Sequence, residues 1–241
     1  MAAKISLASK SSGGLAQLAP LDSASLHQQA YAQLRQALMS GKFAPGEALT
    51  LRGVAAALGT SVMPARDAIM RLTVERALES DGRRVRVPVM TLARLQDVTR
   101  FRLALEGEAA MLAAERATAS EVAAMRAANL AVAKAQKAGR VAKFLVANED
   151  FHFAVYRAAH NDILQSLIET LWLQVGPYLG YLTSGSTNND ISRTDLTAHD
   201  RLIDAIESGD PEAARRALIA DLSESTDVFG PFAADATASV T

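Results

Sequence analysis

The chain has 241 residues, of which 49% are hydrophobic, 21% charged and 5% aromatic, and its formal net charge is −1. The absence of cysteine excludes disulfide bonds and thiolate metal ligands, and the low content of Gly and Pro favours helices. No segment approaches the roughly 18 apolar residues of a membrane span or contains the apolar stretch of a signal peptide, so we expect a cytoplasmic protein without a membrane partner.

Charged residues are divided unevenly along the chain. Residues 23–90 contain nine Lys and Arg against five Asp and Glu, whereas residues 91–241 contain fourteen against twenty. A basic front part and an acidic rear part indicate two modules with different partners. We expect a disordered arm over residues 1–22 and a flexible tail over residues 229–241.

Three short helices are predicted in the front module. The first has apolar residues spaced by four and ends near Gly41. The second follows a Pro-Gly turn, and the third begins after a tight turn with Ser61 as its N-cap and Pro64 in its first turn. Two helices joined by so short a turn are typical of a helix-turn-helix motif. The apolar residues of the first helix are Leu26, Ala30, Leu34 and Leu38.

A β-hairpin with a basic tip is predicted after the third helix. In the sequence LESDGRRVRVPV, Val85 and Val87 alternate with arginines behind an Asp-Gly turn. Three helices and such a hairpin form a winged helix, whose second motif helix enters the major groove while the wing contacts phosphates or the minor groove. The alternative is that the three-helix unit binds another protein.

The arginines of a winged helix divide by the part of the DNA that they contact. We expect Arg66 on the side of the major groove and Arg52 on the side of the sugar-phosphate backbone. Arg83 and Arg84 lie in the predicted wing. The expected partner of the front module is therefore double-stranded DNA.

The sequence GKFAPGEALTLRGVAAALGTSVMPARDAIMRL resembles the GntR family of bacterial transcription regulators. The DNA-binding half of that family runs G-x-F-x-P-G-x-x-L, then L-A-x-x-L-G-x-S, then P-V-R-x-A-L-x-x-L. The resemblance implies that Arg52, Ser61 and Arg66 contact operator DNA. The matching residues are Gly41, Phe43, Pro45, Gly46, Leu49, Leu58, Gly59, Ser61, Pro64, Arg66, Ala68 and Leu72.

One position of the motif departs from this pattern. Many relatives carry an arginine directly after the motif serine, and this chain has Val62 there. A bidentate contact between arginine and guanine contributes about 1 to 3 kcal/mol of discrimination between bases. We therefore expect an altered operator preference and not a loss of DNA binding.

The rear module, residues 91–228, is predicted to be an antiparallel bundle of about six helices without a strand. Its helical pattern is interrupted at five places, each with a capping or turn residue. The fold class is therefore mainly α, with a small hairpin in the front module. The interruptions are ATASE, KAGR, AHND, TSGSTNNDISRTD and SGDP, and we expect Ser120, Gly139, Asn161, Gly185 and Gly209 to begin or end helices there.

The sequence NEDFHFAVYRAAHN places polar residues on an apolar helix face. At 100° per residue, Asn148 and His152 share the face of the neighbouring phenylalanines, whereas Asp150 and Arg157 point to the opposite side. His160, beside an asparagine at the end of the pattern, is expected to close the helix. Asn148 and His152 therefore need polar partners on another helix.

A helical hairpin later in the chain can supply those partners. His199 lies ten residues before the turn at Gly209 and Asp221 ten residues after Pro211, so each lies about 15 Å from the bend. Two imidazoles and two oxygen donors then converge in the bundle core. They form either a divalent metal site or a hydrogen-bonded network without metal.

Both segments resemble the FCD domain, the all-helical C-terminal domain of the FadR subgroup of GntR regulators. In its metal-binding members an Asp and a His four residues apart join two later histidines, and His152 and His199 match two of those ligands. Asn148 stands in place of the usual Asp, and Asp221 in place of the last His. The resemblance implies a divalent metal of the Zn, Ni or Mn type, with Glu149 as a reserve carboxylate.

The resemblance also implies a pocket for a small effector. Arg102 matches the arginine that precedes Leu-Glu in this domain and would pair with an effector carboxylate; the alternative is a surface ion pair with Glu106. Gln174, Tyr178 and Tyr181 stand at or near positions where relatives often carry arginines. We therefore expect a less anionic effector than a tricarboxylate, unless Trp172 and the tyrosines are simply core residues.

The sequence thus predicts a homodimeric transcription regulator, most simply a repressor, that binds a palindromic operator and senses a small organic acid. One alternative is a metal-dependent helical-bundle enzyme that uses His152, His199 and Asp221. No general base and no second Glu-x-x-His pair accompany these residues, so we predict that the chain is not an enzyme. A metal-dependent structural adaptor is the third possibility.

Overall fold

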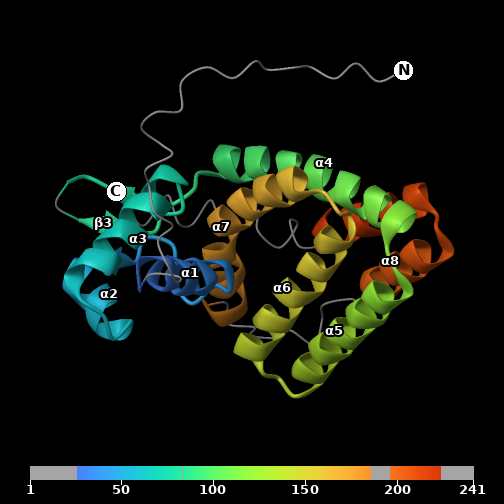
Figure 1. Cartoon of the computed structure of the whole chain (residues 1–241), viewed down its shortest axis with the longest axis horizontal. Helices are drawn as coiled ribbons and strands as arrows, with labels where there is room; N and C mark the ends of the chain where they lie inside the picture. The colour runs from blue at the N-terminus through green and yellow to red at the C-terminus, as the bar shows by residue number, and fades with distance from the viewer. Residues whose placement is uncertain (1–25, 83, 186–195, 224–241) are drawn as a thin grey trace, which may run out of the picture.

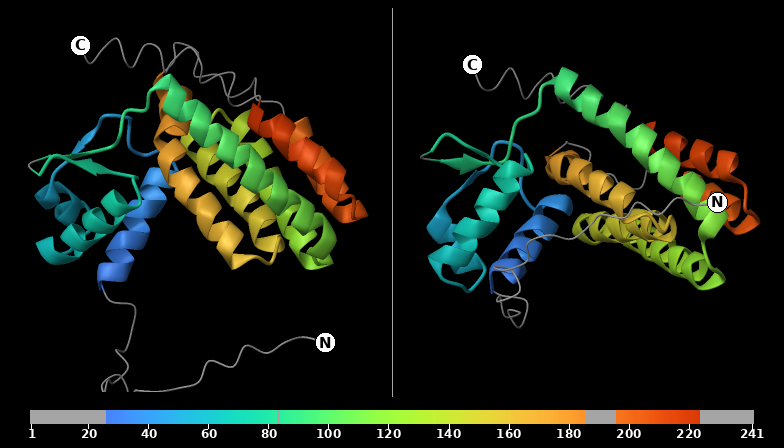
Figure 2. Two further views of the ribbon diagram at one scale, coloured as in Figure 1. Left: turned by 90° about the horizontal axis from the view of Figure 1, so that it is seen from above. Right: turned by 45° about the horizontal axis from the view of Figure 1, so that its top comes forward.

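The computed structural model describes residues 26–82, 84–185 and 196–223, with the helical main chain alone over 181–185 (Figure 1). The predicted arm and tail lie outside these residues, as does Arg83 of the predicted wing. The front module packs against one end of the helical bundle, and the last two helices lie at the opposite end (Figure 2). The mainly helical fold with a small sheet is as predicted.

The front module contains three helices and a three-stranded antiparallel sheet in the order β1-β3-β2. Only four residues separate α2 from α3, which confirms the helix-turn-helix motif. The predicted hairpin is present, but the third strand, two residues before α2, is too short for a period-two pattern to predict. The elements are α1 (Leu26–Met39), β1 (Ala48–Leu49), α2 (Leu51–Ala57), α3 (Val62–Val74), β2 (Glu79–Ser80) and β3 (Val85–Arg86).

Apolar spacing and capping explain where these helices lie. Three of the four residues predicted for the inner face of α1 are buried, whereas Leu26, its first residue, is exposed. The Thr50 side chain caps α2 by accepting a hydrogen bond from the Gly53 amide. Pro64 is buried in the first turn of α3, where no intrahelical amide donor is needed. These helices pack around one apolar core.

The rear module contains six helices in the described part of the chain, the number that the sequence predicts. Consecutive helices run antiparallel where their connections are short, as between α5 and α6 (Figure 1). None of the described helices is both long and apolar enough to span a bilayer. They are α4 (Leu92–Arg116), α5 (Ala119–Lys137), α6 (Val141–Ala158), α7 (Asp162–Gly185), α8 (Thr197–Ser208) and a last helix over residues 211–223.

The connections of the bundle use caps close to those predicted. Gly139 and Gly209 adopt left-handed conformations after α5 and α8. His160 also has a positive φ of 49°, and Asn161 accepts a hydrogen bond from the Leu164 amide in the first turn of α7. The N-cap of α5 is Thr118, in a capping box with Glu121, and not the predicted Ser120, which lies inside the helix.

The two modules meet where the end of α1 crosses α7. Gly176 and Gly180, one turn apart on α7, lie against the main chain of Leu38, Met39 and Gly41. A Cβ atom on either α7 glycine would overlap that main chain. The crossing therefore requires glycine, and it holds the front module directly on a helix of the bundle core.

Candidate metal and effector site

Three buried side chains from three helices meet in the bundle core. His152 lies on α6, His199 on α8 and Asp221 on the last helix, and none is more than 8% exposed. The two histidine Nε2 atoms each lie 3.3 Å from a different carboxylate oxygen of Asp221. The candidate ligand atoms lie within 4.8 Å of one another. The helical hairpin thus places His199 and Asp221 level, and the structure brings together three of the four predicted ligands.

Hydrogen bonds on the far side of each imidazole orient the histidines. His199 Nδ1 lies 2.9 Å from the Oδ1 of Asn129, whose Nδ2 donates to Asp200. That oxygen is an acceptor, so His199 Nδ1 carries the proton. The Tyr156 hydroxyl donates to Glu106 and lies 3.3 Å from His152 Nδ1, so its oxygen is placed to accept a hydrogen bond from that nitrogen.

These tautomers leave both Nε2 atoms without a proton. Two imidazole lone pairs then face the carboxylate of Asp221, so that three acceptor groups converge on one point. Such an arrangement is satisfied by a bound cation, and partners on Nδ1 are typical of metal-binding histidines. The donor set of His152, His199 and Asp221 therefore fits a divalent metal ion.

The protonation states agree with this arrangement. Burial lowers the pKa of His152 to about 3, although the charge of Asp221 opposes the shift. Burial alone would raise the pKa of Asp221, but its polar contact with His199 and the positive charge of Arg102 hold it below its ordinary value. A neutral imidazole and an ionised carboxylate are the forms that coordinate metals.

The other two predicted oxygen donors differ in position. Asn148, one turn before His152, is half-buried, and its side chain makes no hydrogen bond within the part of the chain that the structure describes. Glu149 accepts two 3.0 Å hydrogen bonds from Gln36 of α1, so this reserve carboxylate is already engaged at the junction of the modules. Burial raises the pKa of Glu149 to about 7.

Arg102 and Glu106 form a buried ion pair and not the surface pair of the alternative interpretation. The Arg102 Nε atom lies 2.6 Å from the Glu106 carboxylate, and both side chains are buried. Burial opposes the charge of Arg102, but Glu106 outweighs it and raises the guanidinium pKa above its ordinary value. The guanidinium carbon lies 5.0 Å from the centre of the Trp172 ring, inside the bundle core.

The remaining predicted effector contacts lie along α7. Gln174 accepts a 2.6 Å hydrogen bond from Arg94, and the Tyr178 hydroxyl accepts a hydrogen bond from the Met90 amide. Gln174 therefore contacts the first turn of α4, and Tyr178 contacts the segment that joins the wing to α4. The Tyr181 side chain lies outside the described residues. A role of these three residues in effector binding stays a prediction.

Sequence patterns did not indicate the residues that support the cluster. Asn129 lies on α5, Tyr156 on α6 and Glu106 on α4, and each position is compatible with an ordinary helix. The sequence pattern that could have indicated them is a polar residue on an apolar helix face. Other positions of the bundle show the same pattern. Their roles depend on contacts between helices that are far apart in the sequence.

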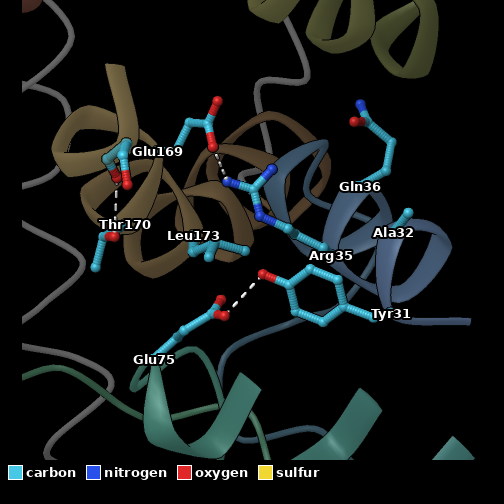
Figure 3. Close-up of a pocket in the computed structure, with 9 residues that line it drawn as sticks. Tyr31, Ala32, Arg35, Gln36, Glu75, Glu169, Thr170 and Leu173 are labelled. Carbon is cyan, nitrogen blue, oxygen red and sulfur yellow. Dashed lines mark hydrogen bonds and ion pairs between the residues drawn. The ribbon is translucent and has the colours of Figure 1, made fainter. Parts of the chain in front are cut away.

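A cleft of about 530 Å³ lies between α1, the end of α3 and α7 (Figure 3). Across it Arg35 of α1 and Glu169 of α7 are 2.6 Å apart. At its edge the Tyr31 hydroxyl donates to Glu75. Since none of the predicted effector contacts lines this cleft, it is a polar part of the junction between the modules and is separate from the buried cluster.

The predicted DNA contacts in the described residues lie on the surface. Ser61 is the N-cap residue of α3, yet its hydroxyl makes no capping hydrogen bond and remains available to another partner. Val62 follows it and is 39% exposed. Arg52, Arg66 and Arg84 are exposed on α2, α3 and the wing. Exposed cations and a hydroxyl at a helix start suit a polyanionic partner.

Comparison with protein families identifies both modules. Residues 26–87 match the bacterial regulatory proteins of the gntR family, and residues 97–224 match the FCD domain. Together these matches cover almost all of the described residues. The boundaries agree with the division of the fold into a winged helix and a helical bundle.

Individual relatives share this organisation. The chain is 30% identical over 195 residues to the HTH-type transcriptional regulator McbR of Escherichia coli K12, which covers 80% of this chain and 88% of that protein. It is 33% identical over 186 residues to the "Probable D-xylose utilization operon transcriptional repressor" of Paenarthrobacter nicotinovorans, covering 75% and 78%. The solved structure of E. coli McbR/YncC superposes with a TM-score of 0.81 at 27% identity, covering 87% of this chain and 100% of that one.

Proposed function

The chain belongs to the gntR family of bacterial regulatory proteins, in the FadR-like subgroup with an FCD domain, and we propose that a divalent metal and a small organic acid in its bundle control operator binding. Membership of the family makes it a DNA-binding transcription regulator and not an enzyme. The observation that carries the proposal is the cluster of two imidazoles that face one buried carboxylate. The proposed control of operator binding by a metal and an effector does not follow from family membership alone.

For the DNA side, we propose that residues 23–90 form the DNA-binding domain and act as one half of a homodimer on a palindromic operator. Arg66 reads a base edge in the major groove, whereas Arg52 and Ser61 contact the backbone. Arg83 and Arg84 bring the wing to the phosphates. Since Val62 offers no hydrogen-bond donor, the operator base opposite it is read by apolar contact.

For the metal, we propose that residues 91–228 form the sensing domain and that His152, His199 and Asp221 hold the ion, with Asn148 as a fourth ligand. Zn²⁺, Ni²⁺ and Mn²⁺ all accept imidazole and carboxylate ligands. When bound, the ion supplies a positive centre that attracts an anionic oxygen. The protein contributes the burial, the fixed tautomers and the exclusion of water around that centre.

For the effector, a small organic acid is supported by the cationic groups that the core offers. Arg102 lies within electrostatic range of Asp221 and faces Trp172, so it borders the candidate metal site. The P. nicotinovorans relative is named as a probable repressor. By analogy we propose that this chain represses its target, acts in the cytoplasm where its DNA lies, and releases DNA when the acid binds.

The mechanism follows from the contacts between the modules. An effector acts on DNA binding only through different affinities for two arrangements of the protein. α7 carries Trp172 beside the cluster and also contacts α1 through its glycines and through Glu169. A small shift of α7 therefore changes the position of the front module and the fit of a dimer to two half-sites.

Metal binding is tested by elemental analysis of untagged protein and by its thermal stability with and without chelator. We expect one metal ion per chain and a lower Tm after chelation, because a ligand that binds only the folded state stabilises it. Absence of stoichiometric metal together with an unchanged Tm would identify the cluster as a hydrogen-bonded network.

DNA binding is tested by fluorescence anisotropy with the promoter next to the gene and with scrambled DNA of the same length. We expect a specific complex whose affinity falls steeply with salt, because protein cations displace counterions from phosphates. A protein that prefers neither DNA at low salt would contradict the proposed operator.

A further inference from the structure

Within the part of the chain that the structure describes, an indole nitrogen of the bundle core lacks a hydrogen-bond partner. Among the described residues, the buried side-chain polar atoms without a partner are Thr60 Oγ1 and Trp172 Nε1. Trp172 is 1% exposed, so bulk water does not reach its N–H group. Because buried donors are almost always paired, such a group marks the place of an acceptor that the folded chain does not supply.

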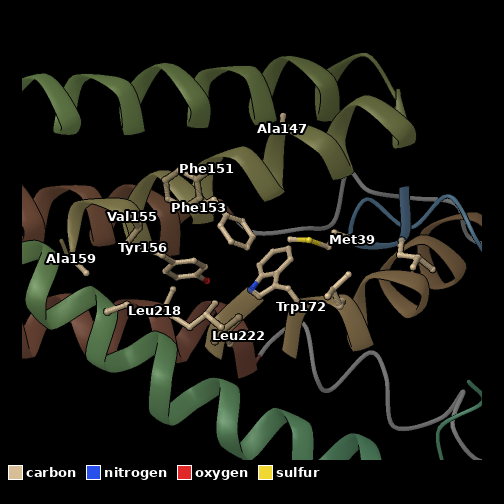
Figure 4. Close-up of a cluster of buried hydrophobic side chains, with 14 of the residues drawn as sticks. Met39, Ala147, Phe151, Phe153, Val155, Tyr156, Ala159, Trp172, Leu218 and Leu222 are labelled. Carbon is tan, nitrogen blue, oxygen red and sulfur yellow. The ribbon is translucent and has the colours of Figure 1, made fainter. Parts of the chain in front are cut away.

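The unpaired nitrogen lies beside the candidate metal cluster. The Trp172 ring centre is 5.5 Å from that of His152, and Arg102 lies over the same indole. In Figure 4 the indole nitrogen and the Tyr156 hydroxyl point into the same part of the core, next to Leu222. The missing acceptor therefore belongs beside the candidate metal ligands.

The charges around this position limit the charge of a ligand. Arg102 is already neutralised by Glu106, and Tyr156 holds Glu106 in place by donating a hydrogen bond to it. Burial and that carboxylate raise the Tyr156 pKa well above its ordinary value, so the hydroxyl stays a neutral donor. The arginine therefore adds no net charge, and a divalent ion with one aspartate leaves a single positive charge to balance.

The surroundings of the unpaired nitrogen are also partly apolar. Leu218 and Leu222 of the last helix and Phe151 of α6 are buried and belong to the apolar cluster that includes Trp172. A second carboxylate in such surroundings would be desolvated without a cation to balance it. A single carboxylate on a short apolar chain matches both the charge and the surroundings.

We propose that Trp172 determines effector specificity by donating its Nε1–H to an oxygen of a small monocarboxylate, and that dicarboxylates and tricarboxylates are rejected. The inference deepens the proposed function and rests on it for the site, because the acid binds next to His152 and Asp221. It adds the donor that recognises the ligand and the number of charges that the ligand carries.

Ligand binding can be followed directly, because Trp172 is the single tryptophan of the chain. The metal-loaded full-length protein is titrated with propionate and with malonate, two three-carbon acids that differ by one carboxylate. We expect a saturable change in tryptophan emission and half-saturation by propionate at a concentration at least 10-fold lower than by malonate. Equal or tighter binding of malonate would overturn the charge argument.

The role of the indole N–H is tested by Trp172→Phe, with calorimetry in place of fluorescence. Loss of a hydrogen bond to a charged group should weaken propionate binding about 10-fold or more, without loss of the metal. Thr60→Val is the matched control, since it removes the other unpaired buried donor in a different module, and its propionate affinity should equal that of the unaltered chain. Replacing the tryptophan by benzothienylalanine keeps the double ring and removes only the N–H donor. This variant tests the donor if Trp172→Phe does not fold.

The outcomes separate this inference from the proposed function. If the protein lacks metal but binds propionate through Trp172, the metal part of the proposed function and the charge argument fail, whereas the role of the Trp172 N–H as the donor to the ligand stands. If metal is present and both donor-free variants bind propionate as tightly as the unaltered chain, the inference fails, because a buried water then satisfies the indole. Failure of the metal-loaded protein to bind propionate at all also overturns the inference.

Discussion

At the scale of single residues, the proposed metal site depends most on Asp221. Its two carboxylate oxygens face one imidazole each, and the imidazole protons are directed away toward Asn129 and Tyr156. Replacing a carboxylate oxygen with an amide NH₂ group would place a donor between the imidazoles. The cluster would then be satisfied as a network and would lose its affinity for cations.

We predict that Asp221→Asn abolishes stoichiometric metal binding and leaves the chain folded. Loss of a directly bound carboxylate should lower metal affinity by more than the roughly 10- to 100-fold typical of a lost supporting residue. Elemental analysis and circular dichroism measure the two effects. Asp204→Asn, an exposed acid on α8, is the control and should retain the metal; equal metal content in both variants would refute the assignment of Asp221.

The residues of the cluster differ in how far the sequence could predict them. His199 and Asp221 are symmetric about a helical turn, and turn geometry is encoded locally by Gly209 and Pro211. Asn129 becomes a partner of His199 only because α5 packs against α8, and no local pattern records that contact. The proximity of His199 and Asp221 was therefore predictable, whereas the residues that orient the imidazoles were not.

The DNA-binding face allows a second prediction at this scale. Arg66→Ala should weaken binding to the operator roughly 5- to 150-fold, because a bidentate base contact contributes about 1 to 3 kcal/mol. Binding to scrambled DNA should change much less. Anisotropy titrations on both DNAs measure the difference, with Arg157→Ala, an exposed arginine of α6, as the control. An equal loss on both DNAs would show that Arg66 contacts only phosphates.

At the scale of elements, α7 connects the two functions of the chain. One face of the helix lies in the bundle core, where Trp172 adjoins the cluster. One and two turns farther along, Gly176 and Gly180 contact the main chain at the end of α1, and the Tyr178 hydroxyl contacts the segment between the wing and α4. The sequence predicted the helix but not its crossing with α1. Glycine is unfavourable inside a helix, and only the close approach of the α1 main chain explains why two glycines stand in α7.

We predict opposite effects for two helical glycines. Gly180→Ala should destabilise the protein by about 1 to 3 kcal/mol, because its Cβ would overlap the main chain of Gly41. Gly107→Ala on α4 meets only side-chain atoms of Arg215 and Ile219 at ordinary van der Waals distances, so the higher helix propensity of alanine should make it neutral or slightly stabilising. Thermal denaturation compares the two. A Gly180→Ala protein as stable as the unaltered chain would contradict the close crossing.

The contact between Glu149 and Gln36 predicts a dependence on pH. The Glu149 pKa is raised from 4.5 to about 7 in the folded chain, so the folded state binds a proton that the unfolded state has lost in this range. The resulting stabilisation is fully present below about pH 4.5 and is lost as the pH rises through 7. Glu149→Gln should lack this component, whereas Glu108→Gln, on an exposed part of α4, should retain it.

Urea denaturation at pH 5.5 and pH 8 measures the effect. The unaltered chain and Glu108→Gln should lose more stability between these pH values than Glu149→Gln does. The same loss in all three proteins would show that Glu149 does not titrate in this range and that the contact with α1 is formed by an ionised carboxylate throughout.

At the scale of the whole molecule, a DNA-binding module sits on the end of a sensing bundle, with no long linker between them. The polar contacts Arg35–Glu169 and Gln36–Glu149 and the glycine crossing join α1 to the bundle at several points. Periodicity and motifs predicted both modules, because each folds around local patterns. They could not predict the junction, which depends on surfaces that match only after both modules have folded.

The most direct test of the account is the operator affinity of the metal-loaded and the metal-free protein, measured by anisotropy at one salt concentration. Coupled sites typically change each other's affinity by about 5- to 150-fold. Because this coupling is reciprocal, the operator should alter the affinity for the metal by the same factor. We predict at least a fivefold difference for the unaltered chain and none for Asp221→Asn. Identical operator affinities with and without the metal in the unaltered chain would contradict control through the bundle core.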